Sequence, residues 1–437
     1  MSLEWQFYIA IVIFLITYGI IISEKIHRSV IALFGAGLMV VFGITDIHQV
    51  FEDYIEWSTI ALLVGMMILV GITAKTGVFQ YVAIKAAKRV KGDPLRLLIT
   101  LSAMTAFASA FLDNVTTVLL IVPVTFSITR ILGINPVPYL IAEIIASNIG
   151  GTATLIGDPP NIMIGSENPH LTFNAFLFNL GPIALIIMCV TLVMLYFIYR
   201  KQLKFDAEKS KMLMSLKEDE YITDVPLMKK SLFVLGLTIL GFVLHSVIHV
   251  DSSVIAMLGA TVLMLIGLRE HDVEEAFDSV EWATIFFFVG LFALVGGLQA
   301  SGVIKSMATQ FLEWTNYEVE ATALVILWVS GIASGFIDNI PFVATMIPLI
   351  ESMAGDLNLA IDSPQINTLW WSLALGACLG GNMTIIGASA NVIVAGLASR
   401  EGHGFSYWEF LKIGFPITMV SLVLAHAYIY LRYLLFL

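Results

Sequence analysis

Four acidic residues interrupt long apolar segments of the sequence, and they are its strongest candidates for chemistry. They are Asp113, Glu143, Asp158 and Asp338. An aspartate at the centre of a membrane helix costs about 2.5–3.5 kcal/mol, so acids at this depth usually have a function. No lysine or arginine stands beside them in the sequence, so each should hold a proton or bind a metal cation. All four are therefore candidates for proton coupling, although an interhelical hydrogen bond is an equal alternative for Glu143.

Asparagines, hydroxyl residues and paired glycines accompany these acids and supply further oxygen atoms. Hard cations prefer several oxygen ligands, and the carbonyl groups beside glycines can turn toward a cation. The candidate residues for binding an ion or a substrate are Asp113, Asn114, Thr116, Gly150, Gly151, Thr152, Thr154, Asp158, Asn161, Asp338, Asn339, Gly380, Gly381, Asn382, Thr384, Ser389 and Asn391. Their chemistry favours a small inorganic ion.

Structural roles compete with ion binding at several of these positions. Asp113 and Asp338 each precede an apolar arm, where an aspartate can cap a helix N-terminus. Asp158 precedes two prolines and can initiate a turn. Asn161 and Asn391 can hold irregular backbone with their side-chain amides.

Histidines and cysteines give no sign of catalysis or of a structural metal site. His245, His249 and His426 lie apart, which favours capping or interfacial roles. Cys189 and Cys378 are isolated in apolar runs, so no disulfide framework or thiolate cluster is predicted. Because no nucleophile–base pair or metal-ligand set is found, we predict that the protein is not an enzyme. No cofactor is predicted, although sodium ions could bind at Asp113, Asn114, Asp338 and Asn339.

The composition indicates a polytopic membrane protein. Of the 437 residues, 58% are hydrophobic and 13% are charged, whereas about 25% of residues are charged in a typical soluble domain. The net charge of −11 argues against nucleic acid as a partner. Apolar segments of sufficient length predict about ten membrane spans. The first begins near Trp5 and should be retained, because no cleavage-site pattern follows it.

An internal repeat relates the two halves of the chain. The segment Glu-Trp-Ser-Thr-Ile at 56–60 recurs as Glu-Trp-Ala-Thr-Ile at 281–285. The same spacing carries Phe-Leu-Asp-Asn-Val at 111–115 onto Phe-Ile-Asp-Asn-Ile at 336–340. After a slip of a few residues, the glycine pair at 150 and 151 matches that at 380 and 381.

The repeat predicts the domain organisation. Each half should contain five spans and one hairpin that enters and leaves on the same side, so the two halves should be inverted relative to each other. The predicted fold is an all-α polytopic membrane protein with two inverted five-span repeats, each with a re-entrant hairpin and a broken helix. The first repeat covers 1–205, with its hairpin at about 94–132 and its broken helix at about 137–165. A linker covers 206–228, and the second repeat covers 229–437, with its hairpin at about 319–352 and its broken helix at about 367–398.

The basic residues predict the orientation in the membrane. The loop at about 200–230 carries eight lysines and arginines, so the positive-inside rule places it in the cytoplasm and both termini outside. Residues 206–224 mix both signs of charge and should form a solvated linker. Residues 78–91 should form an amphipathic helix on the cytoplasmic face. We expect the protein to lie in the lipid bilayer of the plasma membrane.

Two motifs resemble those of a known transporter family. They are Phe-Leu-Asp-Asn-Val-Thr-Thr at 111–117 and Gly-Gly-Thr-Ala-Thr-Leu-Ile-Gly-Asp-Pro-Pro-Asn at 150–161. Both resemble the ArsB/NhaD family of the ion transporter superfamily, which includes arsenite efflux permeases, sodium/proton antiporters and P-protein-like members. The resemblance covers nearly the whole chain.

The resemblance implies sodium sites and a mechanism. Relatives in the superfamily bind sodium between each hairpin tip and the adjoining broken helix, and they work as dimers by an elevator-type movement. Carried over by motif, one site would involve Asp113 and Asn114 with the backbone of 150–154, and the other would involve Asp338 and Asn339 with the backbone of 380–384.

The resemblance also implies a substrate. The leading prediction is efflux of arsenite or antimonite, coupled to protons or sodium. Sodium/proton antiport and transport of a carboxylate or another anion are the alternatives, and an ion channel is the rival of a different class. The implied partners are a second copy of the chain and, for an arsenical pump, a soluble ATPase.

Overall fold

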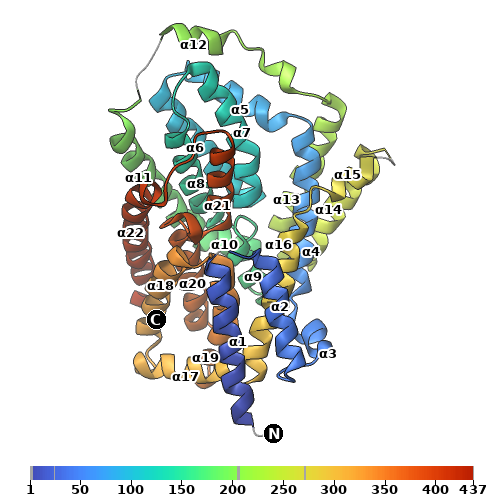
Figure 1. The fold of residues 1–437 in the computed structure, drawn as a ribbon, viewed down its shortest axis with the longest axis vertical. Coiled ribbons are helices and arrows are strands. Elements are labelled where there is room, and N and C mark those ends of the chain that lie inside the picture. Colours follow the sequence, from blue (N-terminus) through green and yellow to red (C-terminus); the bar gives the residue numbers. More distant parts are fainter. Residues whose placement is uncertain (1–2, 24, 204–206, 270–271, 437) are drawn as a thin grey trace.

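The protein is helical throughout its described part. The computed structural model describes residues 3–23, 25–203, 207–269 and 272–436, and no strand occurs in these ranges (Figure 1). The α-helices are α1 (Leu3–Ser23), α2 (Arg28–Val41), α3 (Ile47–Gln49), α4 (Trp57–Lys75), α5 (Val78–Arg89), α6 (Pro94–Leu112), α7 (Asn114–Leu132), α8 (Val137–Gly151), α9 (Pro159–Glu167), α10 (Phe173–Asn179), α11 (Gly181–Tyr199), α12 (Ala207–Met214), α13 (Val225–Ile248), α14 (Ser252–Gly267), α15 (Val273–Phe277), α16 (Trp282–Ala300), α17 (Val303–Trp314), α18 (Val319–Phe336), α19 (Asn339–Asp356), α20 (Pro364–Gly380), α21 (Ser389–Arg400) and α22 (Tyr407–Arg432). Short π and 3-10 segments are η1 (Val50–Tyr54), η2 (Glu218–Tyr221), η4 (Ile385–Gly387) and η5 (Leu434–Phe436). The predicted all-α class is confirmed, whereas the predicted boundary at residues 205 and 206 lies outside the described residues.

Nine helices within these ranges are long and apolar enough to cross a membrane by length and composition. They are α1, α4, α6, α7, α11, α13, α16, α18 and α22, and three shorter apolar helices are α2, α8 and α14. This count does not match the expected ten spans one to one, because α6, α7 and α18 are arms of the predicted hairpins. Two expected spans also correspond to the shorter helices α2 and α14.

The first hairpin turns at a single residue. α6 ends at Leu112 and α7 begins at Asn114, so only Asp113 separates the two arms. The other ends of the arms come together again, because Gly92 before α6 lies against the side chain of Leu132 at the end of α7. The chain therefore returns to the place where the hairpin began.

The second hairpin has the same form. Residues 337–338 separate α18 from α19. The preceding helix, α17, contacts both arms: Thr309 donates a hydrogen bond to Asp356 at the end of α19 (2.9 Å), and the hydroxyl oxygens of Thr315 and Thr322 at the start of α18 lie 2.7 Å apart. These contacts bring the outer ends of both arms to α17.

Glycines and prolines break the helix that follows each hairpin. α8 ends at Gly151, and α9 begins at Pro159 after an irregular stretch. A Cβ atom at Gly150 would overlap the backbone of Ala106 in α6, and one at Gly380 would overlap the backbone of Gly331 in α18. Only glycine permits this approach of two helix backbones, so each hairpin is packed directly against its broken helix.

The helix bounds recur along the chain. α4 (Trp57–Lys75) and α5 (Val78–Arg89) have the same lengths and spacing as α16 (Trp282–Ala300) and α17 (Val303–Trp314). In Figure 1, α5 and α17 lie at opposite ends of the molecule. The sequence repeat is thus accompanied by a repeat of helix lengths.

The linker between the halves is packed against α5, which corrects the expectation of a solvated segment. Lys88 in α5 forms an ion pair with Glu218 (2.5 Å) and also donates a hydrogen bond to the carbonyl oxygen of Leu216 (2.8 Å). The backbone N–H of Thr223 donates to the carbonyl oxygen of Thr76 (3.0 Å). The mixed charges of the linker are therefore used for docking as well as for hydration.

Replacing Lys88 with methionine should release this part of the linker. The ammonium of Lys88 lowers the pKa of Glu218, so the pair stabilises the docked linker above the pKa of the free glutamate and loses this effect as the pH falls through the lowered pKa. We expect faster hydrogen–deuterium exchange of the linker amides in K88M than in the wild type at neutral pH, with the difference disappearing at acidic pH. An exposed control is Lys217→Met, whose ion pair with Glu220 lies within the linker; equal exchange in K88M and the wild type would contradict the docking role.

Candidate functional site

Asp158 lies where the two hairpin tips meet. Its side chain is fully buried, and its Oδ1 accepts hydrogen bonds from the amide nitrogens of Asn114 (3.2 Å) and Asn339 (3.4 Å). Asn114 begins the second arm of the first hairpin, and Asn339 begins that of the second hairpin. Its Oδ2 has no nitrogen or oxygen donor within the described residues, and the thiol of Cys378 lies beside the carboxylate. One carboxylate therefore joins both hairpins and keeps one oxygen without such a donor.

A chain of buried asparagines extends this junction. Asn148 in α8 accepts a hydrogen bond from Asn114 (3.0 Å) and donates to the amide oxygens of Asn382 (2.9 Å) and Asn391 (2.9 Å). All of these side chains are at most 2% exposed. The network thus connects the first hairpin and first broken helix with the second broken helix.

Sequence reasoning missed Asn148, although a signal was present. Asn148 is an amide in a mostly apolar helix, two residues before the pair Gly150-Gly151, and a buried amide needs partners. Its counterpart in the second half, after the slip in the repeat, is Cys378. The repeat therefore gave no support for a polar role at this position.

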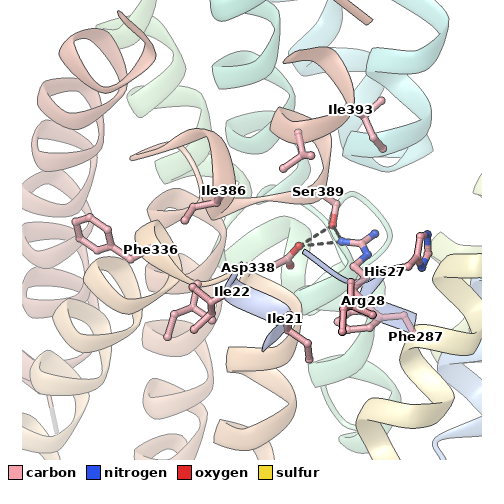
Figure 2. A pocket seen from close by; sticks show the side chains of 13 residues that line it. Ile21, Ile22, His27, Arg28, Phe287, Phe336, Asp338, Ile386, Ser389 and Ile393 are labelled. Atoms are coloured by element: carbon pink, nitrogen blue, oxygen red, sulfur yellow. Dashed lines mark hydrogen bonds and ion pairs between the residues drawn. The ribbon is translucent and has the colours of Figure 1, made fainter. Parts of the chain in front are cut away.

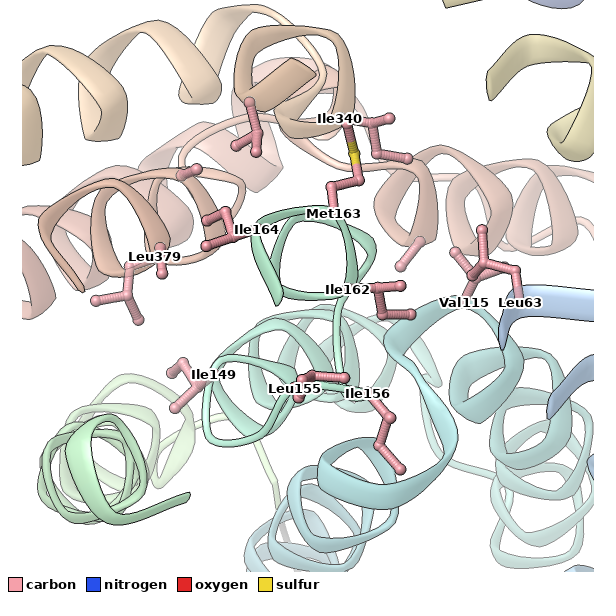
Figure 3. Close-up of a cluster of buried hydrophobic side chains, with 14 of the residues drawn as sticks. Leu63, Val115, Ile149, Leu155, Ile156, Ile162, Met163, Ile164, Ile340 and Leu379 are labelled. Atoms are coloured by element: carbon pink, nitrogen blue, oxygen red, sulfur yellow. The ribbon is translucent and has the colours of Figure 1, made fainter. Parts of the chain in front are cut away.

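Apolar side chains surround the junction. The short helix α9 carries Ile162, Met163 and Ile164 on different sides, and Figure 3 shows them pointing toward neighbouring elements. Val115 and Ile340, each next to a hairpin-tip asparagine, belong to the same buried cluster. The polar network is therefore enclosed by hydrocarbon, where its hydrogen bonds are not exchanged for bonds to water.

Asn161 and Asn391 hold the irregular backbone of the two broken helices. Asn161 donates to the carbonyl oxygen of Thr154 (2.9 Å), with longer bonds to Gly151 and Thr152. Asn391 donates to the carbonyl oxygens of Gly381 (2.7 Å) and Thr384 (2.9 Å). These bonds satisfy carbonyl groups that the helix breaks would otherwise leave unpaired.

The threonines of the breaks bind backbone. The hydroxyl of Thr152 donates to the carbonyl oxygen of Asn148 (2.7 Å), and that of Thr384 donates to Gly335 in α18 (2.6 Å). The hydroxyl of Thr154 donates to the carbonyl oxygen of Ala110 in α6. Two of the three threonines therefore fasten a broken helix to its hairpin.

Asp113 caps the second arm of its own hairpin. It accepts hydrogen bonds from the backbone N–H of Thr116 (2.9 Å) and from its hydroxyl group (2.5 Å). Its φ is +71° with ψ 155°, a backbone region that residues other than glycine rarely occupy. Asn114 turns its amide nitrogen to Asn148 and Asp158, so the two residues of the predicted first sodium site have separate partners.

Asp338 has a fixed cation beside it, which corrects the expectation of a base-free acid. Arg28 at the start of α2 donates from Nη1 to Oδ2 of Asp338 at 3.0 Å and to the hydroxyl of Ser389 at 2.5 Å (Figure 2). Oδ1 of Asp338 accepts the backbone N–H of Ile340 (3.1 Å) and so caps α19. The sequence gave no hint of this pair, because Arg28 and Asp338 lie 310 positions apart.

Glu143 in α8 is a second fully buried acid of the first half. Its Oε1 accepts a hydrogen bond from the hydroxyl of Thr125 in α7 (2.5 Å), and its Oε2 is unpaired within the described residues. It forms the predicted interhelical hydrogen bond and still has one oxygen without a partner. Elsewhere in the described chain, no group of three or more histidine, cysteine, aspartate or glutamate side chains converges as a metal site.

A family comparison decides the class of the protein. Residues 18–376 match the family described as "Citrate transporter". The chain belongs to the citrate transporter family. Family membership covers both hairpins and the first broken helix, which include the junction at Asp158.

Curated relatives of this citrate transporter family member include proteins named as uncharacterized transporters and as P proteins. An uncharacterized transporter of Mycobacterium tuberculosis is 45% identical over 429 residues, which cover 97% of this chain and 98% of the relative. The P protein of Homo sapiens is 35% identical over 509 residues, which cover 98% of this chain and 60% of the P protein. The chain thus spans well over half, but not all, of the P protein.

A solved structure shares the fold. The YdaH transporter of Alcanivorax borkumensis, whose crystal structure is described as having an unusual topology, aligns with a TM-score of 0.63 over 92% of this chain and 98% of that chain. At 11% identity this likeness concerns the fold alone. Together the comparisons show a multi-pass membrane transporter of the ion transporter superfamily, and its relatives indicate a transporter and not an enzyme. Membership of the ArsB/NhaD family in particular stays a prediction.

Replacing Asn148 with alanine should destabilise this member of the citrate transporter family, because Asn148 joins the buried asparagine network. The substitution leaves the amide oxygens of Asn382 and Asn391 without their donor, and an unsatisfied buried polar group costs about 1–3 kcal/mol. We expect a lower unfolding temperature in detergent by thermal denaturation. The control is Thr261→Ala, which removes an exposed hydroxyl that bonds only within its own helix. An unchanged unfolding temperature in N148A would show that the network contributes little.

Proposed function

We propose that the protein is a secondary active transporter in which Asp158 carries the coupling ion, a proton or sodium. The carboxylate of Asp158 is fully buried, one oxygen accepts from both hairpin tips, and the other has no nitrogen or oxygen donor in the described part. No lysine or arginine forms an ion pair with it there. An unpaired buried charge is costly, so a proton or a cation on Asp158 would stabilise this arrangement.

The asymmetry of the repeat supports the coupling role of Asp158 at the junction. The position that corresponds to Asp158 in the second half is Ala388 at the start of α21. Both tip asparagines, Asn114 and Asn339, therefore donate to the same acid. A change in its charge would be felt by both hairpins at once, which is what coupling an ion to a conformational change requires.

An elevator-type movement is the proposed mechanism. Glycines allow two pairs of helices outside the hairpins to touch through their backbones: Gly65 of α4 lies against Ala256 and Met257 of α14, and Gly290 of α16 lies against Ala32 of α2 and its neighbour. These pairs form a compact scaffold, whereas the hairpins pack on their own broken helices. We propose that this core moves as a body against the scaffold, in a homodimer with inverted repeats.

The orientation and location are also proposed. The opposite placement of α5 and α17 (Figure 1) supports inverted halves. The basic loop around 200–230 supports a cytoplasmic position for that end of the molecule, with both termini outside and the protein in the plasma membrane.

A small ion is the proposed substrate. Arsenite or antimonite efflux follows from the family resemblance, and sodium/proton antiport fits the unpaired acids Asp158 and Glu143. A carboxylate is supported by two observations: the family description names citrate, and Arg28 places a fixed positive charge beside the second hairpin tip. A channel would differ from all three by flux that does not saturate.

Replacing Asp158 with asparagine tests the coupling role. The variant keeps an oxygen for Asn114 and Asn339 but cannot take up the coupling ion, so gradient-driven uptake into proteoliposomes should fall at least about tenfold, because an intramembrane carboxylate of this kind is the expected ion carrier. Sodium and proton gradients are imposed separately. The probes are radiolabelled sodium, arsenite and, as a carboxylate, butyrate. The control is Asp362→Asn at an exposed position. Gradient dependence retained in D158N would refute the role of Asp158.

The substrate prediction has a separate test. Expression of the wild type in an arsenite-sensitive host that lacks its own efflux system should raise arsenite tolerance if the leading prediction is right, because efflux lowers the internal concentration. D158N should not protect. Equal growth of cells with the wild type and with D158N would remove arsenite from the candidate substrates. Saturable uptake of another probe would then identify that probe as the leading candidate.

A further inference from the structure

The carboxylate of Asp338 occupies an anion-binding position made by other parts of the chain. Its Oδ2 accepts from Nη1 of Arg28 (3.0 Å) and from the hydroxyl of Ser389 (2.8 Å), and its Oδ1 accepts the backbone N–H of Ile340 (3.1 Å). A guanidinium, a hydroxyl and an N–H group of a first helical turn are the donors that bind carboxylate ligands. In this conformation the chain fills the position with its own side chain.

Arg28 keeps donors that Asp338 does not use. A guanidinium has five N–H donors. The hydrogen bonds of Arg28 in the described chain use Nη1 for Asp338 and Ser389, and Nη2 for Thr284 at 3.5 Å, and none uses Nε. The ring of Phe287 lies 5.0 Å from the guanidinium carbon and supports its position by a cation–π contact. The guanidinium is thus held in place with part of its fork available.

An apolar cavity adjoins these donors. Its volume is about 300 Å³, and α1, α16, α18 and α21 with their adjoining loops contribute to its wall. Figure 2 shows Ile22, Phe336 and Ile386 to one side of Asp338, and Arg28 and Ser389 to its other side. A cavity of this size and character accommodates a short hydrocarbon chain attached to a polar group.

The first hairpin tip has no such arrangement. Asp113 bonds to Thr116 of its own arm, and the described ion pairs include none with Asp113. At the repeat spacing, the counterpart of Arg28 is Ser253. Among the described ion pairs, the second hairpin tip therefore has an arginine partner and the first has none.

We propose that Arg28 and Ser389 bind the carboxylate group of a small monocarboxylate whose apolar body fills the adjoining cavity, and that Asp338 competes with this ligand for Arg28. The inference rests on the proposed function, because it names a substrate class for the transporter and a place for it. It goes beyond that function by assigning the recognition of the substrate's carboxylate to Arg28 and Ser389, whereas Asp158 is assigned the coupling ion.

Competition between the ligand and Asp338 couples anion binding to cation binding. When the ligand takes Arg28, Asp338 loses its partner and gains affinity for a proton or sodium. When a cation neutralises Asp338, Arg28 is released for the ligand. Each binding event therefore favours the other, and the linkage is reciprocal. A ligand that binds alone must break the partly buried ion pair of Arg28 and Asp338, which costs free energy.

The charge of the site sets its selectivity. One guanidinium compensates one carboxylate, whereas the remaining charges of a tricarboxylate would face apolar side chains of the cavity without partners. A monocarboxylate should therefore bind better than citrate, although the family description names citrate.

Binding of radiolabelled butyrate to the purified full chain in detergent, at fixed pH and sodium concentration, tests the proposal. Asp338→Asn removes the competing charge and keeps a good N-cap for α19, so it should bind butyrate at least about tenfold more tightly than the wild type. Arg28→Gln should bind at least about tenfold more weakly, in line with losing a partly buried charged partner. In the double variant R28Q/D338N the gain from D338N should disappear, and citrate should not compete with butyrate in any variant.

Folding and specificity need their own controls. Arg130→Gln removes the arginine of an exposed ion pair with Glu401 and should leave butyrate binding unchanged, and thermal unfolding checks that each variant is folded. Weaker or equal butyrate binding by folded D338N, or unchanged binding by folded R28Q, would overturn the proposal. Gradient-driven uptake that depends on Asp158 without butyrate binding would refute the anion site alone. Butyrate binding with the expected pattern but no gradient-driven uptake of any probe would refute the proposed function alone.

Discussion

The carboxylate of Asp158 is the group on which the centre of the molecule depends. Asn114 and Asn339 donate hydrogen bonds to it from two hairpins that are far apart in the sequence, and no other asparagine of the described chain does so. In an apolar interior these few polar contacts are directional, whereas the surrounding packing is not. They therefore fix how the two hairpin tips face each other, and the amide chain through Asn148 fixes how the broken helices follow.

The two halves of the chain have diverged at the positions that carry charge. The first half has the acids Asp158 and Glu143, neither of which has a basic partner among the described ion pairs. The second half has Asp338, whose charge is balanced by Arg28 from the first half. The repeat preserved helix lengths and the glycines at the helix breaks, while the charged side chains became different. If the two hairpin tips bind ions as proposed, this difference in charge would give them different affinities for ions.

Local features of the sequence were sufficient to predict most of the elements. Asp-Asn at each hairpin tip, glycine pairs and the prolines after Asp158 act on their own segments, so the breaks and turns follow from steric and capping rules. The partners of Asp338 and of Asn148 could not be predicted in this way, because they depend on which distant helices come together. The charge pattern of the linker was also ambiguous, since lysines and glutamates can either remain hydrated or form ion pairs. Only the structure, which places Lys88 beside Glu218, shows that the linker is docked.

The glycine contacts between each hairpin and its broken helix have a consequence for how ions pass. Gly150 on Ala106 and Gly380 on Gly331 leave no room for even one added carbon atom between the backbones. A continuous water-filled path along these contacts would require the helices to part and would expose their carbonyl groups to hydrocarbon. In the proposed mechanism, an ion held at the tips would therefore move together with the helices that hold it, and the close packing would prevent a leak along this route.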